Sequence, residues 1–229
     1  MTALSLDLRR PVAVLLGAFN PAIFSPGWIA NHFFDIPEGS DLRVVEAVLQ
    51  MDRQFLALTF VEGIALNVTL ERLEIYAANT NALVVVETVL SRIMEVLPHT
   101  PIMAIGCNFS WVDIDPAAAV ADLFDSPEGF EGLHKVLARQ YSVAIDLEDA
   151  TLNFVRAATE SAVNFNFNFH RNVENSEACL ALVAGLVHGE LERSKEMMKK
   201  FYGYEDYKTE GLTIAENQGE GSDATETSH

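Results

Sequence analysis

The segment from residue 164 to residue 170 constrains the fold more than any other part of the chain. It alternates asparagine with phenylalanine and ends in histidine, and a period of two is the spacing at which a strand points its side chains to opposite faces. The pattern predicts a strand of an antiparallel sheet, with an aromatic face on a core and an amide face toward water or a partner. The candidate interaction surface is therefore Asn164, Asn166, Asn168 and His170.

The rest of the chain predicts an α+β fold. Short connections between the apolar runs favour antiparallel meander pairing, and cap residues followed by three- and four-residue apolar spacing indicate helices. The expected strands are 11–17, 43–50, 54–60, 64–68, 72–77, 102–113, 141–145, 152–157 and 164–170, and the expected helices are about 26–37, 83–97, 127–137 and 176–202. The apolar spacing within 43–50 also fits a helix. We expect antiparallel sheets, each packed by a long amphipathic helix.

The order of the elements suggests two related sheet-plus-helix modules, residues 11–100 and 101–204, within a single domain over 1–204. No residue-level repeat supports a duplication. Beyond Tyr204 the composition changes to glycine, serine, threonine and acidic residues, which predicts an acidic disordered tail over 205–229.

The charge of the chain argues against direct nucleic-acid binding. The 33 acidic residues outnumber the 15 basic ones and give a net charge of -18, which repels phosphate backbones. The main basic cluster, within 193–200, is interleaved with glutamates and predicts ion pairs along a helix. The acidity leaves open a role in solubility, a basic protein partner, or mimicry of DNA.

The two cysteines and the hydropathy suggest a cytoplasmic protein. Cys107 and Cys179 lack the paired spacing of a zinc or redox site, and free cysteines suit a reducing compartment. No apolar stretch reaches the eighteen or so residues that predict a membrane span. Arg9 and Arg10 precede an apolar run as in a secretory signal, but the acidic Asp7 favours a buried first strand instead.

Four residues are weak candidates for a catalytic site. His99, Cys107 and Asp113 could supply a base, a nucleophile and an orienting group, and Asp113 with Asp115 could hold a divalent cation through carboxylate oxygens. However, a cysteine in an apolar strand is usually a small buried hydrophobe. The chain also lacks phosphate-loop, nucleophile-elbow and zinc-helix motifs, so we expect no cofactor and no metal.

Two glycines four residues apart, Gly185 and Gly189, fall on one face of the last expected helix. Missing side chains allow another backbone to approach closely. The spacing predicts either tight packing within the chain or a homodimer formed through this helix.

The segments Gly17-Ala18-Phe19-Asn20-Pro21 and His99-Thr100-Pro101, the latter leading to Ala104-Ile105-Gly106 and Asn108, carry a resemblance. With Val68-Thr69 and Arg72, they resemble a family of uncharacterised bacterial proteins with a G-x-F-N-P start and an H-T-P-[IV]-x-A-[IVL]-G-x-N centre. The resemblance spans mainly residues 11–110. It implies a shared fold and a bacterial or phage setting, and it supplies no catalytic residue.

Three functions follow as hypotheses. The first is a non-enzymatic interaction or scaffold protein of a bacterial assembly or a conflict system such as antiviral defence, with a protein partner whose charge, basic or not, is left open. The alternatives are an enzyme with a site near His99, Cys107 and Asp113, and an acidic DNA mimic that inhibits a nucleic-acid-binding protein.

Overall fold

A computed structural model of the chain describes residues 4–34, 44–49, 55–60, 63–116, 120, 137–159 and 161–212. The expected helix over 127–137 lies outside these residues except for Leu137, and so does the chain beyond residue 212.

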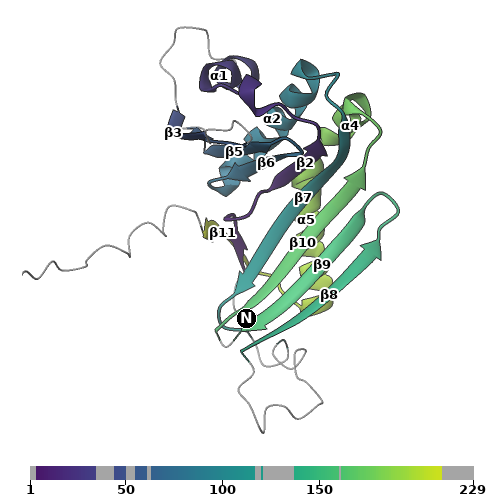
Figure 1. Ribbon diagram of the computed structural model, residues 1–229. Coiled ribbons are helices and arrows are strands. Elements are labelled where there is room, and N and C mark those ends of the chain that lie inside the picture. The colour runs from purple at the N-terminus through teal and green to yellow at the C-terminus, as the bar shows by residue number, and fades with distance from the viewer. Residues whose placement is uncertain are drawn as a thin grey trace, which may run out of the picture.

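Eleven strands of the described chain join one sheet (Figure 1). Its main order is β3-β4-β5-β6-β2-β7-β10-β9-β8, with antiparallel neighbours throughout, and β1 and β11 lie off this path. The strands are β1 (Leu4–Asp7), β2 (Ala13–Gly17), β3 (Val44–Leu49), β4 (Phe55–Phe60), β5 (Ile64–Thr69), β6 (Arg72–Ala77), β7 (Ile102–Asp113), β8 (Ala138–Asp146), β9 (Thr151–Thr159), β10 (Val163–Asn172) and β11 (Tyr207–Leu212).

The long strand β7 connects the two parts of the sheet. One of its edges pairs with β10 along nearly its whole length. The other edge pairs with β2 near Cys107, opposite Ala13, and then with β1 near Trp111, opposite Leu6. Two short strands from the start of the chain therefore follow one another along the same edge.

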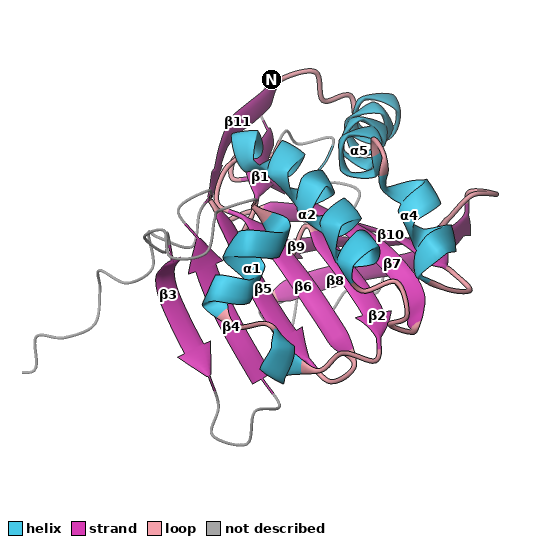
Figure 2. Ribbon diagram, turned by 90° about the horizontal axis from the view of Figure 1, so that it is seen from above, coloured by secondary structure: helices cyan, strands magenta, loops and turns pink. Residues whose placement is uncertain are grey.

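The helices lie on one face of the sheet, as Figure 2 shows. They are α1 (Pro26–Phe33), α2 (Leu83–Val96), α4 (Ser176–Val183) and α5 (Leu186–Tyr202), with short 3-10 turns η1 (Pro21–Ile23) and η2 (Thr80–Ala82). Phe165, Phe167 and Phe169 of β10 are buried in the core between sheet and helices. The prediction drawn from the alternating segment is therefore confirmed for its aromatic half.

The α+β class is confirmed. Strands from both halves of the chain belong to one sheet rather than to two. The division into two related modules stays a prediction.

The last predicted helix is interrupted, which corrects its extent. It forms two helices, α4 and α5, separated at Ala184 and Gly185, because Gly185 adopts a left-handed backbone with φ of 72°. An added Cβ at Gly185 or Gly189 would meet no atom within 4 Å. Neither glycine therefore serves close packing against another described element, and Gly185 instead allows the change of direction.

Residues 207–212, within the segment whose composition predicts a disordered tail, form β11 beside β1. The tail over the remaining residues stays a prediction. Tyr207 packs edge-to-face on Trp111 with ring centroids 5.2 Å apart, and its hydroxyl donates to the Lys195 carbonyl at 2.8 Å. These contacts bury part of an otherwise polar segment. The average composition of the segment does not indicate the contacts that its single residue Tyr207 makes.

The two motifs that carry the family resemblance meet in space. The amide of Ala18 donates to the Pro101 carbonyl at 3.0 Å. An added Cβ at Gly17 would lie 2.4 Å from that carbonyl oxygen, so the close approach requires glycine there. Asn20 also accepts from the Ala22 amide at 3.1 Å, which caps η1.

The basic residues of α5 form ion pairs, as their interleaving with glutamates predicts. Lys195 pairs with Glu192 at 2.6 Å and Arg193 pairs with Glu190 at 3.5 Å, both one turn apart on the helix. Arg193 also pairs with Asp149 before β9 at 3.1 Å, which the helical spacing does not predict. Within the described residues, no helix is long and apolar enough to cross a membrane.

Candidate binding surface

The face of the sheet opposite the helices carries a row of amides and hydroxyls. Since the phenylalanines of β10 point toward the helices, the asparagines between them lie on the other face. Pairing aligns Asn168 with Asn108 of β7 and with Asn153 of β9, and Asn166 with Ser110. No described helix covers this open face, which lies in front of α5 in Figure 1.

Hydrogen bonds link these side chains across three strands in one direction. The Asn153 side-chain nitrogen donates to Asn168 Oδ1 at 2.9 Å, and Asn168 Nδ2 donates to Asn108 Oδ1 at 2.7 Å. Asn108 Nδ2 then donates to the Pro11 carbonyl at 2.9 Å. The series fixes the orientation of the Asn168 and Asn108 amides, because each of them accepts through its oxygen from one neighbour and donates through its nitrogen to the next.

A second link lies beside this series, where the Ser110 hydroxyl donates to Asn166 Oδ1 at 2.6 Å. Asn166 accepts there through its oxygen, which leaves the donor capacity of its NH2 group unused by this bond. Asn164, Asn166 and Asn168 are all half-buried. The surface is thus a set of positioned amides with donor capacity that the hydrogen bonds within the chain do not use up.

Gly106 makes room for this arrangement. An added Cβ at residue 106 would lie 3.3 Å from Asn168 Nδ2, closer than ordinary contact. Gly106 and Asn108 both belong to the central motif of the resemblance, so this motif contributes directly to the open face.

The open face is hollowed next to three arginines. One hollow of about 670 Å³ is lined by Asp7, Arg9, Arg10, Ser110, Gln140, Val155, Ala157, Asn164 and Asn166. An adjoining hollow of about 290 Å³ shares Arg10, Ser110, Val155 and Asn166 with it and extends to Arg72, Asn108, Asn153 and Asn168. The combined lining holds three arginines and a single carboxylate, in a chain with a net charge of -18.

That carboxylate, Asp7, is paired within the protein. Arg9 Nε and a terminal nitrogen donate to its two oxygens at 2.8 and 2.7 Å, and the Arg9 backbone amide donates at 3.0 Å. Burial works to raise the pKa of the Asp7 carboxyl, but these hydrogen bonds and the nearby charge of Arg10 hold it below the usual value. Arg10 makes no ion pair with the residues described, so its charge in the larger hollow is not offset by a paired carboxylate as that of Arg9 is.

A second polar cluster lies further along the same face, on β5 and β6. The Tyr76 hydroxyl donates to Glu74 Oε2 at 2.8 Å, Asn67 Nδ2 donates to Tyr76 at 3.2 Å, and Arg72 pairs with Glu74. Burial, followed by the hydrogen bond to Glu74, raises the pKa of Tyr76 to about 12. The cluster orients Arg72, which lines the smaller hollow.

His170 lies at the far end of the row. It is half-buried, and its Nε2 lies 3.1 Å from Asn172 Oδ1. The linings of the two hollows do not include it.

The catalytic candidates have four different environments. His99 is exposed in the turn before β7, and Asp115 is exposed after it. Cys107 is fully buried on the helix side, where burial raises the pKa of its thiol to about 12. Asp113 is buried and accepts from the Tyr204 hydroxyl at 2.6 Å and from the Asp115 amide at 2.9 Å.

The two hydrogen bonds give Asp113 a structural role. Burial keeps the Cys107 thiol in its neutral form at physiological pH. In the described part of the chain, no group of three or more histidine, cysteine, aspartate or glutamate side chains could hold a metal ion.

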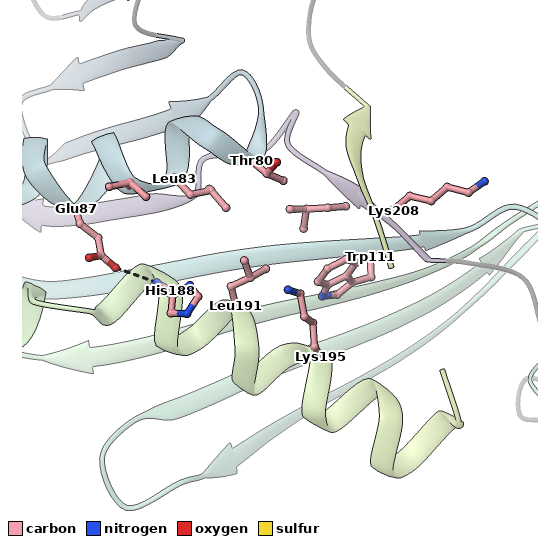
Figure 3. A pocket seen from close by; sticks show the side chains of 10 residues that line it. Thr80, Leu83, Glu87, Trp111, His188, Leu191, Lys195 and Lys208 are labelled. Carbon is pink, nitrogen blue, oxygen red and sulfur yellow. Dashed lines mark hydrogen bonds between the residues drawn. The ribbon is translucent and has the colours of Figure 1, made fainter. Parts of the chain in front are cut away.

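A smaller cavity of about 170 Å³ lies between α2, α5 and β1 (Figure 3). Its walls include Glu87, whose carboxylate accepts from the His188 amide at 2.9 Å and the Gly185 amide at 3.3 Å. Glu87 thus caps the start of α5, where backbone amides lack partners within the helix. The cavity lies where α2 meets α5, and the carboxylate of Glu87 in its wall already accepts two hydrogen bonds from the start of α5.

Sequence reasoning missed the arginines and the amides of the neighbouring strands. A signal for the latter exists: Asn108 and Ser110 alternate with Phe109 and Trp111 as the asparagines of β10 alternate with phenylalanines. The proximity of Arg9 and Arg10 to this row follows from the pairing of β1 with β7 and has no local signal.

Comparisons with protein-family models, with curated proteins and with solved structures find no match. The resemblance to a bacterial family stays a prediction based on the motifs themselves.

Proposed function

We propose that this chain is a non-enzymatic interaction protein that binds an acidic peptide segment of a partner protein on the open face of its sheet. The single observation that carries the proposal is the uncovered row of oriented amides next to Arg9, Arg10 and Arg72. Amides hydrogen-bond to peptide groups, and arginines bind carboxylates through paired donors. The bacterial setting follows from the family resemblance alone.

The charge of the hollow selects among partners. A nucleic acid would bring many phosphates close to a chain of net charge -18, which is unfavourable at long range. A short segment with one or two carboxylates meets the arginines with much less of that repulsion, because it carries far fewer negative charges. A basic partner, as the net charge suggests, would instead bind elsewhere on the acidic surface.

The first experiment selects random-sequence peptides that bind the intact protein, and then measures the affinity of labelled selected peptides by fluorescence anisotropy. We expect aspartate and glutamate to be enriched among them. Affinity should fall as salt rises, because exposed charges are screened over about 8 Å at physiological ionic strength.

Two substitutions locate the site. Arg10→Ala and Arg72→Ala should each weaken binding roughly tenfold, equivalent to one charge-assisted hydrogen bond of about 1.5 kcal/mol. The matched control is Arg92→Ala on α2, which removes an arginine that pairs with Glu95 on the helix side. Selected peptides without acidic residues, or equal losses in all three variants, would contradict the proposal.

A further inference from the structure

The cavity of about 170 Å³ on the helix side of the sheet has a mainly apolar interior. Buried side chains from separate elements form its walls: Leu6 of β1, Leu83 of α2, Trp111 of β7 and Leu191 of α5. In another protein, an apolar cavity of about 150 Å³ stays free of water and binds benzene. The space is therefore large enough for one ring or one short chain, and its walls favour an apolar occupant.

The charged groups of the cavity lie at its two ends, as Figure 3 shows. Glu87 and His188 lie at one end, and Lys195 and Lys208 lie at the other, beside Trp111. The Glu87 carboxylate already accepts from two backbone amides at the start of α5. Among the described residues that line the cavity, the end beside Trp111 has two lysines and no carboxylate.

Lys195 has donors left for a ligand. Its ammonium is directed toward the cavity, next to Leu191 and Trp111 (Figure 3). Its partner among the described residues is Glu192, whose Oε1 accepts at 2.6 Å. An ammonium group carries three donors, so the ion pair does not use all of them. Lys208 makes no ion pair with the described residues and adds a second positive charge at this end.

We propose that this cavity binds a small carboxylic acid with an apolar body, either one aromatic ring or a short aliphatic chain. The body lies between Leu6, Leu83 and Leu191, and the carboxylate accepts from Lys195. A neutral molecule would leave the donors of Lys195 unused, and a cation would meet two lysines. A long-chain acid would exceed the volume.

The proposed site is separate from the open face. Trp111 points to the helix side of β7, whereas Asn108 and Ser110 of the same strand point to the face that carries the arginines. Binding of a small acid goes beyond the proposed peptide binding, and either can fail without the other.

Isothermal titration calorimetry of the full chain with benzoate tests the proposal, and benzyl alcohol provides a neutral compound of similar size. Physiological ionic strength screens the long-range repulsion between an anion and a chain of net charge -18. We expect benzoate to bind roughly tenfold more tightly than benzyl alcohol, because it gains a charge-assisted hydrogen bond.

Lys195→Met should remove this preference, by weakening benzoate about tenfold and leaving benzyl alcohol unchanged. Lys199→Met is the matched control, because Lys199 is an exposed lysine of the same helix that pairs with Glu205. Arg10→Ala should also leave benzoate binding unchanged, which separates the cavity from the arginines of the open face.

Fluorescence locates the ligand independently. Trp28→Phe leaves Trp111 as the single tryptophan, and its emission should change with benzoate in parallel with the heat signal. Leu191→Phe fills the cavity and should weaken both compounds tenfold or more, with thermal unfolding checked to show that the variant is folded. No binding of benzoate at millimolar concentration, equal affinity for the two compounds, unchanged affinity in Lys195→Met, or a loss in Arg10→Ala would each overturn the proposal.

Discussion

The Tyr204 hydroxyl donates a hydrogen bond to Asp113 Oδ2 at 2.6 Å, and both residues are buried. Tyr204 follows the end of α5, and Asp113 ends β7. Burial and then the hydrogen bond to Asp113 raise the pKa of Tyr204, so the phenol remains a donor at physiological pH. The bond attaches the segment after α5 to the central strand.

Tyr204→Phe should lower the free energy of unfolding by about 2 kcal/mol, because it removes a donor to a buried carboxylate. Asp113→Asn keeps one acceptor oxygen but turns an NH2 group toward the second donor, so it should also lower the free energy of unfolding. Urea denaturation of the two variants measures both values. Equal stability of Tyr204→Phe and the parent chain would show that the bond contributes nothing.

The two glycines of the last helical segment should respond to alanine with opposite signs. Gly185→Ala forces a side chain into a left-handed backbone and should destabilise the protein by about 1 kcal/mol. Gly189→Ala lies within α5 with no atom near an added Cβ, and it should stabilise by about 0.5 to 1 kcal/mol. Thermal unfolding of the two variants is the measurement, and a gain from both would mean that residue 185 does not require glycine.

Asp7 predicts a specific loss of stability in acid. Because folding lowers the pKa of its carboxyl, Asp7 contributes stability above the ordinary aspartate pKa of about 3.9, and the contribution is lost as pH falls through the lower folded value. Asp7→Asn should be less stable at neutral pH and should lose less stability between neutral and acidic pH. Urea denaturation across that range for both chains tests the sign, and parallel curves would contradict it.

Both cysteines should resist modification in the folded protein. Burial raises the pKa of the Cys107 thiol to about 12 and that of Cys179 to about 11, and neither side chain is exposed. Ellman's reagent should therefore react with neither thiol until the chain is unfolded, and then with both. Rapid labelling of native Cys107 would revive its assignment as a nucleophile.

Local patterns predict those elements whose signals are local. The Ser25 hydroxyl accepts from the Trp28 amide at 3.3 Å, as the cap-then-proline sequence predicts for the start of α1. The apolar spacing from Leu83 onward gives α2 to within one residue. The alternation of polar and apolar residues predicts β10 and β7, because one face of each strand packs on the core.

Elements that depend on distant partners were not predictable in this way. β1 has only four residues, and the six residues of β11 place polar side chains at both alternate sets of positions, so neither shows an apolar period by itself. The apolar spacing also continues across Gly185, so it gives no sign of the break between α4 and α5. Likewise, the hydrogen bonds from Asn153 through Asn168 to Asn108 depend on the register in which β9, β10 and β7 pair, and the sequence alone does not indicate that register.

The parallel pairing of β1 with β11 has a consequence for the biogenesis of the protein. Leu4 pairs with Tyr207, so the first and last described strands are neighbours although about two hundred residues separate them. Contacts between such distant segments close a large loop and form slowly. During synthesis, the edge of β1 that pairs with β11 therefore stays unpaired until β11 has left the ribosome. Truncation before residue 207 would leave this edge open to other strands.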